Sequence, residues 1–235
     1  MPDKSKNSLI ICARMGSSRL PGKSLMPLNN RLVIEQVATQ LEKVHWPYVF
    51  AIPDSKSDDI LYKKISERYG SDKVFRGDPV NVAKRMWEVA SELELSNIMR
   101  ITGDDPCHSS DLINASISEF LQNRNQSEYF STVFDSLPDG LYHEIIPFDI
   151  LDQLNTDSLN NPITAEHVTF TLNKTTKDDL SNVYLKILEK YEVNGLKLCI
   201  DTKDDYAFIT NLFTKYTGST LNTRKVIDDF KRQSR

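Results

Sequence analysis

Short apolar runs alternate with stretches of helical spacing through the first 130 residues, and this pattern limits the folds open to the chain. The first apolar run covers residues 9–13, and residues 32–44 then repeat apolar side chains every three or four positions. Further strands are expected at 48–52, 74–75, 97–101 and 129–134, with helices at 56–69, 80–94 and 109–123. Strands joined through helices favour right-handed crossovers, so we predict an α/β fold with a mostly parallel central sheet.

The second half of the chain is less regular. We expect strands at 144–148 and 196–200, and helical segments at 149–155, 162–171, 203–216 and 223–234. Because no Pro/Gly/Ser-rich linker separates the two halves, residues 1–235 are interpreted as a single domain. Residues 135–170 form an irregular excursion from it.

Composition excludes several classes of function. The chain of 235 residues has a formal net charge of -4 and a pI of about 5.6, which disfavours a nucleic-acid partner. The three widely spaced cysteines form neither a disulfide framework nor a zinc motif. Since no apolar run approaches the roughly 20 residues of a membrane span, we expect a cytoplasmic protein without a membrane partner.

The two most distinctive loops, 14–24 and 102–108, each follow a predicted strand. Ligands of open parallel sheets bind beyond the carboxyl ends of the strands, so both loops are expected at one site. In the first loop, Gly16 allows close backbone approach, while Ser17 and Ser18 add hydroxyls and amides. Arg14 and Lys23, with a further arginine between them, supply charge suited to a polyphosphate. The spacing is not that of a Walker A loop, and it also permits a solvated basic loop with turn-forming glycines.

Carboxylates follow two other predicted strands. Asp104 and Asp105 come after Gly103, and Asp201 comes after the predicted strand 196–200. Mg²⁺ is commonly held by one or two carboxylates together with phosphate oxygens, so these residues could hold it for nucleotidyl transfer. A polar turn before a helix and an aspartate N-cap are the alternative interpretations.

Residues 13–17 and 19–23 resemble the N-terminal signature of the sugar-acid cytidylyltransferases, a family that includes CMP-Kdo synthetase. The resemblance is greatest to the branch described as spore-coat polysaccharide biosynthesis proteins, and it extends to Arg-x-Thr-Gly-Asp-x-Pro at 100–106 and Ile-Asp-Thr at 200–202. It implies a Rossmann-like nucleotidyltransferase fold.

The resemblance also implies roles for individual residues. The first loop would hold the CTP phosphates, with Arg14 and Lys23 as the main cations and backbone near Ala13 facing the cytosine. Gly103 would adjoin the nucleotide, and Asp104 and Asp201 would bind Mg²⁺. Arg14, Lys23 and Asp104 are thus the predicted catalytic residues.

Two further segments resemble the family, and they are expected near the nucleotide and the acceptor. Arg76 lies in a Phe-Arg-Gly segment that adjoins the nucleotide in the family, although a surface turn is the alternative. Residues 137–145 resemble Phe-Pro-Asp-Gly-Leu-Asp-Val-Glu, but Tyr142 and His143 depart from it. With Glu144 and Asp105, these two are the predicted substrate-binding residues. The family often dimerises through the excursion at 135–170, so a homodimer is expected.

The function predicted from these features is transfer of CMP from CTP to a hydroxyl of a sugar acid of the 3-deoxy ulosonic or nonulosonic type, with release of pyrophosphate. Such a reaction belongs to the biosynthesis of a surface polysaccharide or glycan. Two alternatives remain open at this point. The acceptor could be a phosphorylated sugar or alditol, or the chain could bind nucleotide sugars without catalysis.

Overall fold

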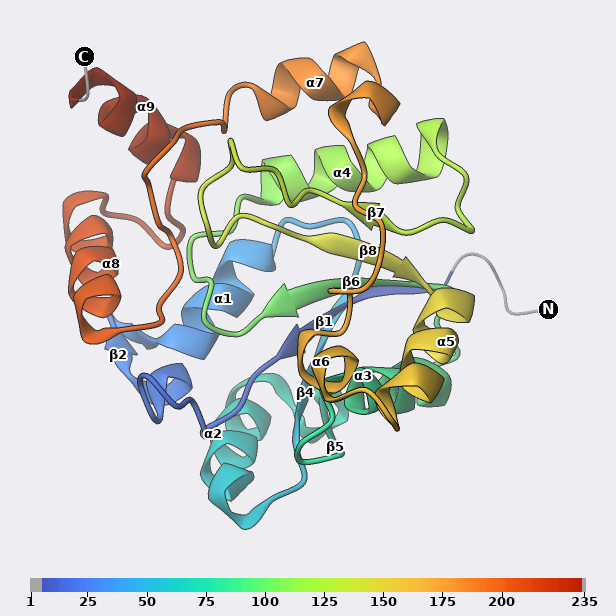
Figure 1. The fold of residues 1–235 in the computed structure, drawn as a ribbon. Helices are drawn as coiled ribbons and strands as arrows, with labels where there is room; N and C mark the ends of the chain where they lie inside the picture. The colour runs from blue at the N-terminus through green and yellow to red at the C-terminus, as the bar shows by residue number, and fades with distance from the viewer. Residues whose placement is uncertain (1–5, 234–235) are drawn as a thin grey trace.

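The computed structural model describes residues 6–233, and its centre is a six-stranded sheet in the order β5-β4-β1-β6-β8-β7 (Figure 1). The four strands from β5 to β6 are parallel, whereas β8 runs antiparallel to both of its neighbours. The predicted α/β fold with a mostly parallel sheet is therefore confirmed. The strands of this sheet are β1 (Asn7–Cys12), β4 (Tyr48–Pro53), β5 (Val74–Gly77), β6 (Asn97–Thr102), β7 (Phe130–Ser131) and β8 (Glu144–Pro147).

The central strand β1 explains why helices cover both faces of the sheet. Leu9, Ile10 and Ile11 are fully buried, and successive side chains of a strand point to opposite faces. Leu9 and Ile11 join one hydrophobic core, and Ile10 joins the other. A strand with two apolar faces is stable only between two helical layers.

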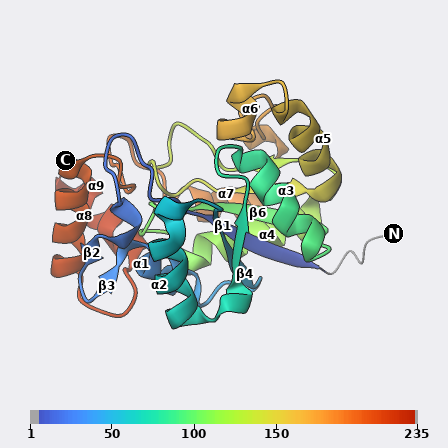
Figure 2. The same ribbon diagram turned by 90° about the horizontal axis from the view of Figure 1, so that it is seen from below.

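A different set of helices packs against each face of the sheet. One core is built against α1 (Val33–Leu41), α2 (Asp59–Tyr69), α4 (Ser110–Asn123), α7 (Asn182–Leu188), α8 (Lys203–Lys215) and α9 (Thr223–Gln233). The other is built against α3 (Val82–Glu92) and α5 (Phe148–Ser158), with α6 (Pro162–His167) beside them. Figures 1 and 2 both show α3, α5 and α6 gathered on one face of the sheet. None of the helices within residues 6–233 has the length and apolar character needed to cross a bilayer.

The prediction of a late strand at 196–200 is wrong. This buried segment makes a single β-bridge, between Lys197 and Asp139, and joins no sheet. It packs against the turn that contains Gly140, whose φ is 92°. A Cβ atom at Gly140 would lie 2.6 Å from the carbonyl carbon of Leu198, so the missing side chain permits this close approach. The turn replaces a neighbouring strand as the partner of the segment.

Other predicted boundaries need smaller corrections. The strand at 129–134 shortens to β7, and helix α7 had no predicted counterpart. The predicted loop at 14–24 ends in a 3₁₀ turn, Lys23–Leu25, and a small hairpin of β2 (Pro27–Leu28) and β3 (Arg31–Leu32) follows it. The predicted helix 223–234 reaches Gln233, and its last residue lies outside the described part. Dimer formation through residues 135–170 stays a prediction.

Candidate active site

A cleft of about 260 Å³ opens at the carboxyl ends of β1 and β6. These neighbouring strands form the switch point of the sheet, because the connection after β1 covers one face and α3, which leads into β6, covers the other. The loops after both strands line the cleft, together with the start of α3, the end of α6 and Asp201. The loops predicted to share a site are therefore brought together.

The loop after β1 is folded back on itself by backbone hydrogen bonds. The carbonyl of Met15 accepts from the amides of Ser17 at 3.0 Å and Gly22 at 2.9 Å, and Gly22 has a φ of 75°. The amide of Met15 donates to the buried carboxylate of Asp58 at 2.7 Å. These bonds hold the loop against the sheet edge, with Ser17 and Ser18 at the wall of the cleft.

Gly103 is the point of closest approach between the two loops. Its amide donates to the carbonyl of Cys12 at 2.8 Å. A Cβ atom at Gly103 would lie 2.7 Å from the Cβ of Ala13, closer than a side chain tolerates. Glycine is thus needed here for the loop after β6 to reach the loop after β1, and this contact brings Asp104 into the cleft.

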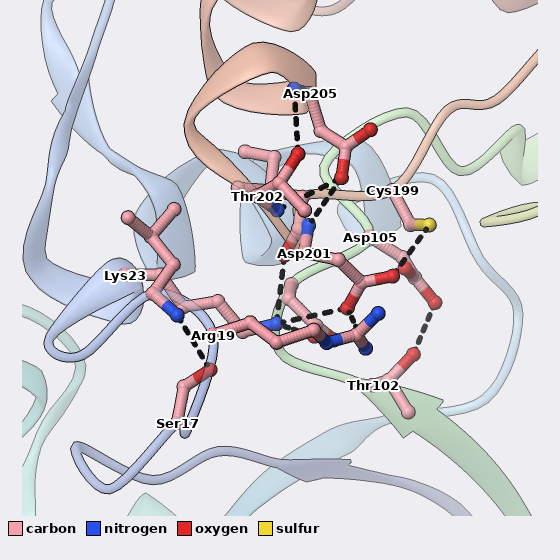
Figure 3. A network of polar contacts seen from close by, with 12 residues as sticks. Ser17, Arg19, Lys23, Thr102, Asp105, Cys199, Asp201, Thr202 and Asp205 are labelled. Atoms are coloured by element: carbon pink, nitrogen blue, oxygen red, sulfur yellow. Dashed lines mark hydrogen bonds and ion pairs between the residues drawn. The ribbon is translucent and has the colours of Figure 1, made fainter.

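Lys23 contacts both predicted metal ligands, Asp104 and Asp201. Figure 3 shows Lys23 beside Asp201. Its ammonium donates to Asp104, to the carbonyl of Ile200 at 2.7 Å and to Asp201 at 3.4 Å. Only 8% of Lys23 is exposed, so this charge is largely withdrawn from water. The segment that ends at Asp201 is tied to the same loop, because the amide of Ile200 donates to the carbonyl of Asp104 at 3.0 Å.

The two carboxylates suit a divalent cation. Asp104 and Asp201 already converge on one cationic group, the Lys23 ammonium, and each keeps part of its surface exposed. Mg²⁺ typically takes one or two protein carboxylates and completes its shell with water and phosphate oxygens. Within residues 6–233 there is no cluster of three or more metal-ligating side chains.

Arginines from the first loop lie at the mouth of the cleft. The guanidinium of Arg14 is 3.0 Å from the carboxylate of Glu166 on α6, and that of Arg19 is 2.7 Å from Asp201. Both arginine side chains are well exposed, so their ion pairs are weak and can be exchanged for ligand phosphates. Arg14 and Lys23 thus both border the cleft, and their contact with CTP phosphates stays a prediction.

The start of α8 supports Asp201 from behind. Thr202 and Asp205 form a capping box, in which the Asp205 carboxylate accepts from the amides of Asp201 at 3.0 Å and Thr202 at 2.8 Å. Lys197 contacts the carboxylates of both Asp201 and Asp205. Burial raises the pKa of Asp205, but the bonds from Lys197 and the Thr202 amide outweigh it and lower the pKa to about 2.

Two of the predicted nucleotide-binding residues do not line this cleft. A Cβ atom at Gly16 would have no neighbour within 4 Å, so that glycine lies on the open side of its loop. Arg76, on β5, pairs with Asp54 at 3.0 Å and with Asp59 at 2.7 Å. Its guanidinium also donates to the carbonyl of Ser55 at 2.8 Å. These partners engage Arg76 at the adjacent edge of the sheet.

The predicted substrate-binding residues also lie outside the cleft lining. Tyr142 donates to the carboxylate of Asp139 and to a backbone carbonyl, both at 3.0 Å. The buried ring of His143 contacts Ser116 at 2.5 Å, and burial lowers the pKa of His143 to about 4. An acceptor contact by His143 is not supported, because the side chain belongs to the core.

Glu144 and Asp105 are likewise enclosed. The carboxylate of Glu144 pairs with Arg100 at 3.1 Å and accepts from Thr169 at 2.6 Å. Asp105 accepts a hydrogen bond from Thr102. Burial and the neighbouring Asp104 raise the pKa of Asp105 well above its ordinary value. Both residues stand behind the cleft and contact groups of its wall rather than its open space.

Two arginines of the cleft, Arg85 and Arg100, are absent from the predicted site. Arg85 lies on the buried stripe of α3, three residues after Val82 and four before Val89. A charged residue on an apolar helical stripe is the signal that could have revealed it. Arg100 lies within the apolar run of β6 and could have been recognised in the same way.

Comparison with known proteins shows that the chain is similar to nucleotide-transferring enzymes. A family model described as cytidylyltransferase matches residues 8–227. The chain is 29% identical over 213 residues to the spore coat polysaccharide biosynthesis protein SpsF of Bacillus subtilis, which covers 88% of this chain and 85% of that protein. The resemblance predicted from the motifs is confirmed.

Solved structures agree on the fold. A cytidylyltransferase from Leptospira borgpetersenii superposes with a TM-score of 0.80 at 23% identity, covering 97% of this chain and 95% of the other. A CMP:2-keto-3-deoxy-manno-octonic acid synthetase in complex with CTP has a TM-score of 0.59 at 17% identity, covering 91% of this chain and 100% of the other. At these identities the likeness establishes the architecture.

Proposed function

This chain belongs to the cytidylyltransferase family, and from that premise we propose that it transfers CMP from CTP to a hydroxyl of a sugar acid, with release of pyrophosphate. Both the spore-coat relative and the CMP-sugar-acid synthetase of similar fold bear names that link them to saccharide chemistry. The product would serve the biosynthesis of a surface polysaccharide or glycan.

One observation carries the proposal. Asp104 and Asp201, almost a hundred residues apart in the chain, meet at the ammonium of Lys23 beside a basic, serine-containing loop. A cleft with exchangeable cations on one wall and two convergent carboxylates on another suits a metal-bound triphosphate. A protein that only binds nucleotide sugars has no need for such a carboxylate pair.

The reaction is a displacement at the α-phosphorus of CTP. The acceptor hydroxyl oxygen forms the new bond to phosphorus, the bond to the bridging oxygen of the β-phosphate breaks, and the hydroxyl proton is released to solvent. In this scheme Arg14 and Lys23 hold the β- and γ-phosphates and offset the charge that develops on pyrophosphate. Catalysis then comes from positioning and electrostatic stabilisation.

Mg²⁺ held by Asp104 and Asp201 would neutralise charge on the phosphate oxygens. The carboxylates fit this role because Lys23 now balances them, and an incoming triphosphate offers that ammonium a new anionic partner. Asp205 and Lys197 keep Asp201 oriented, and Gly103 keeps Asp104 at the cleft. In this scheme the ion pairs of the free protein are replaced by ion pairs with Mg²⁺ and the triphosphate.

The test is pyrophosphate release from each of the four NTPs with Mg²⁺, across 3-deoxy ulosonic acids, nonulosonic acids and sugar phosphates. We expect release only with CTP and a sugar acid, and a loss of about 100-fold or more in Asp104→Asn. The matched control is Asp204→Asn, an exposed carboxylate on α8 outside the cleft, which should keep the wild-type rate. Release with a sugar phosphate but not with a sugar acid would contradict the proposed acceptor. No CTP binding would overturn the whole proposal.

A further inference from the structure

Arg85 is a buried cation without a carboxylate partner. Only 2% of the residue is exposed, although its side chain borders the cleft. One guanidinium nitrogen donates to the backbone carbonyl of Asp78 at 2.6 Å, and the Nε atom has no hydrogen-bond partner. Within residues 6–233, no carboxylate lies within 4.0 Å of this guanidinium. Gly77 makes room for it, because a Cβ atom there would lie 3.0 Å from the Cγ of Arg85.

Arg100 adds a second guanidinium to the same part of the cleft. It lies on β6, and its side chain also borders the open space. Its nitrogen Nη1 pairs with Glu144 at 3.1 Å, while its Nε atom, like that of Arg85, has no partner. Glu144 is further engaged by Tyr129 and Thr169. Within residues 6–233, Glu144 is therefore the one carboxylate that forms an ion pair with either guanidinium, and the carboxylates of Asp58 and Asp78 act on Arg85 only from a greater distance.

A buried guanidinium with an unpartnered nitrogen is unfavourable unless a ligand supplies the missing acceptor. The guanidinium fork matches the two oxygens of a carboxylate and binds them through parallel hydrogen bonds. The nearby pair of Arg14 and Glu166 is already neutral within itself and does not compensate Arg85. The missing partner of the buried pair is thus an anionic group of a ligand.

The two ends of the cleft differ in their surroundings. Lys23 contacts Ile200, a residue of the core behind α1 and α8, whereas Arg85 belongs to the helix that covers the opposite face. In the proposed reaction Lys23 holds the leaving pyrophosphate, and the attacking and leaving oxygens lie roughly in line. Because Arg14 and Lys23 are assigned to the phosphates in this reaction, the carboxylate of a sugar-acid acceptor is the ligand anion left for Arg85 and Arg100.

We propose that Arg85 and Arg100 form an anion subsite that binds the carboxylate of the acceptor and so selects acids over neutral sugars. The assignment rests on the proposed function, because it needs a sugar acid as the acceptor and phosphates held by Arg14 and Lys23. It makes Arg85 a specificity-determining residue, distinct from the phosphate-binding Arg14 and Lys23.

The test compares each acid of the acceptor panel with its methyl ester, by calorimetric binding and by kcat/KM. Wild-type protein should prefer an acid over its ester by about 10- to 100-fold. Arg85→Met should abolish that preference by weakening the acid alone, with the Kd of CTP unchanged within about twofold. Arg85→Lys keeps the charge without the fork and should retain part of the preference.

The matched control is Lys84→Met, which removes a partly exposed cation from the next position of the same helix and should change neither ligand. Undiminished acid preference in both Arg85 variants would overturn the subsite, as would wild-type protein that binds acid and ester equally or binds neither. Weaker CTP binding with unchanged acid binding would assign the guanidinium to the nucleotide instead. Failure of the proposed function is distinguishable, because wild-type protein would then release no pyrophosphate. The calorimetric binding experiment would still measure the contribution of Arg85 to acid binding.

Discussion

At the scale of single residues, the cleft depends on side chains that are small or absent as much as on charged ones. Ala13 and Gly103 face each other where the loops after β1 and β6 meet, and their contact leaves no space for another methyl group. This contact also determines the position of Asp104, the next residue along the chain. A glycine that packs between two loops therefore supports both the stability of the contact and the position of Asp104.

We predict that Gly103→Ala lowers the free energy of unfolding by about 1–3 kcal/mol, because the new Cβ overlaps Ala13. Urea unfolding measures this loss, and pyrophosphate release should fall with it. Gly16→Ala is the control, since its Cβ meets open space and stability should change by no more than about 0.5 kcal/mol. Equal stability of the two variants would show that the loops are not held in this close contact.

At the scale of elements, α8 matters to the cleft through its first turn. The capping box of Thr202 and Asp205 satisfies amides at the start of the helix, and the Asp205 carboxylate also accepts from the amide of Asp201. The orientation of Asp201 is therefore coupled to helix initiation. Asp204 lies in the same turn and is exposed, which makes the two neighbours a natural comparison.

We predict that Asp205→Ala costs about 1–2 kcal/mol of stability, because the cap amides lose their acceptor. Activity should fall by roughly 10-fold as Asp201 loses its support. Urea unfolding and pyrophosphate release measure the two effects, and Asp204→Ala should leave both close to wild type. A stability loss without any loss of activity would contradict the coupling between the cap and Asp201.

At the scale of the whole molecule, packing holds two histidines neutral. Burial lowers the pKa of His143 to about 4, and burial together with His143 lowers the pKa of His108 to about 3. The ordinary value is about 6.5, so in the unfolded chain both histidines take up protons at a higher pH than in the folded protein. The stability due to their neutral forms is complete above pH 6.5 and is lost as the pH falls toward 4.

We therefore predict that the free energy of unfolding decreases as the pH is lowered from 7 to 4.5, by up to roughly 3 kcal/mol for His143 alone. Urea unfolding at a series of pH values measures the slope. His143→Gln removes this group and should give a shallower slope, whereas His45→Gln, at an exposed site, should keep that of the wild type. An unchanged slope in His143→Gln would mean that the imidazole titrates normally in the folded protein.

Local patterns in the chain are sufficient to predict the α/β fold and the centre of the site. Apolar spacing indicates which segments are buried, and strand ends in a parallel sheet share one edge, so the meeting of the loops that carry Arg14, Lys23 and Asp104 follows from their positions after β1 and β6. Asp201 reaches the same cleft from a buried segment that is not a strand of the sheet, and the amide of Ile200 ties that segment to Asp104. The motif resemblance added the family.

Other features depend on contacts between distant segments, which no local pattern encodes. Residues 196–200 have the composition of a strand, yet the backbone beside Gly140 replaces a strand partner. His143 lies in a segment expected at the acceptor, but Ser116 on α4 encloses its ring. Arg85 became part of the cleft because α3 turns its buried stripe toward the sheet edge. Sequence alone determined which residues could make the site, whereas tertiary packing decided which of them face the cleft, because burial and pairing are set by neighbours far away in the chain.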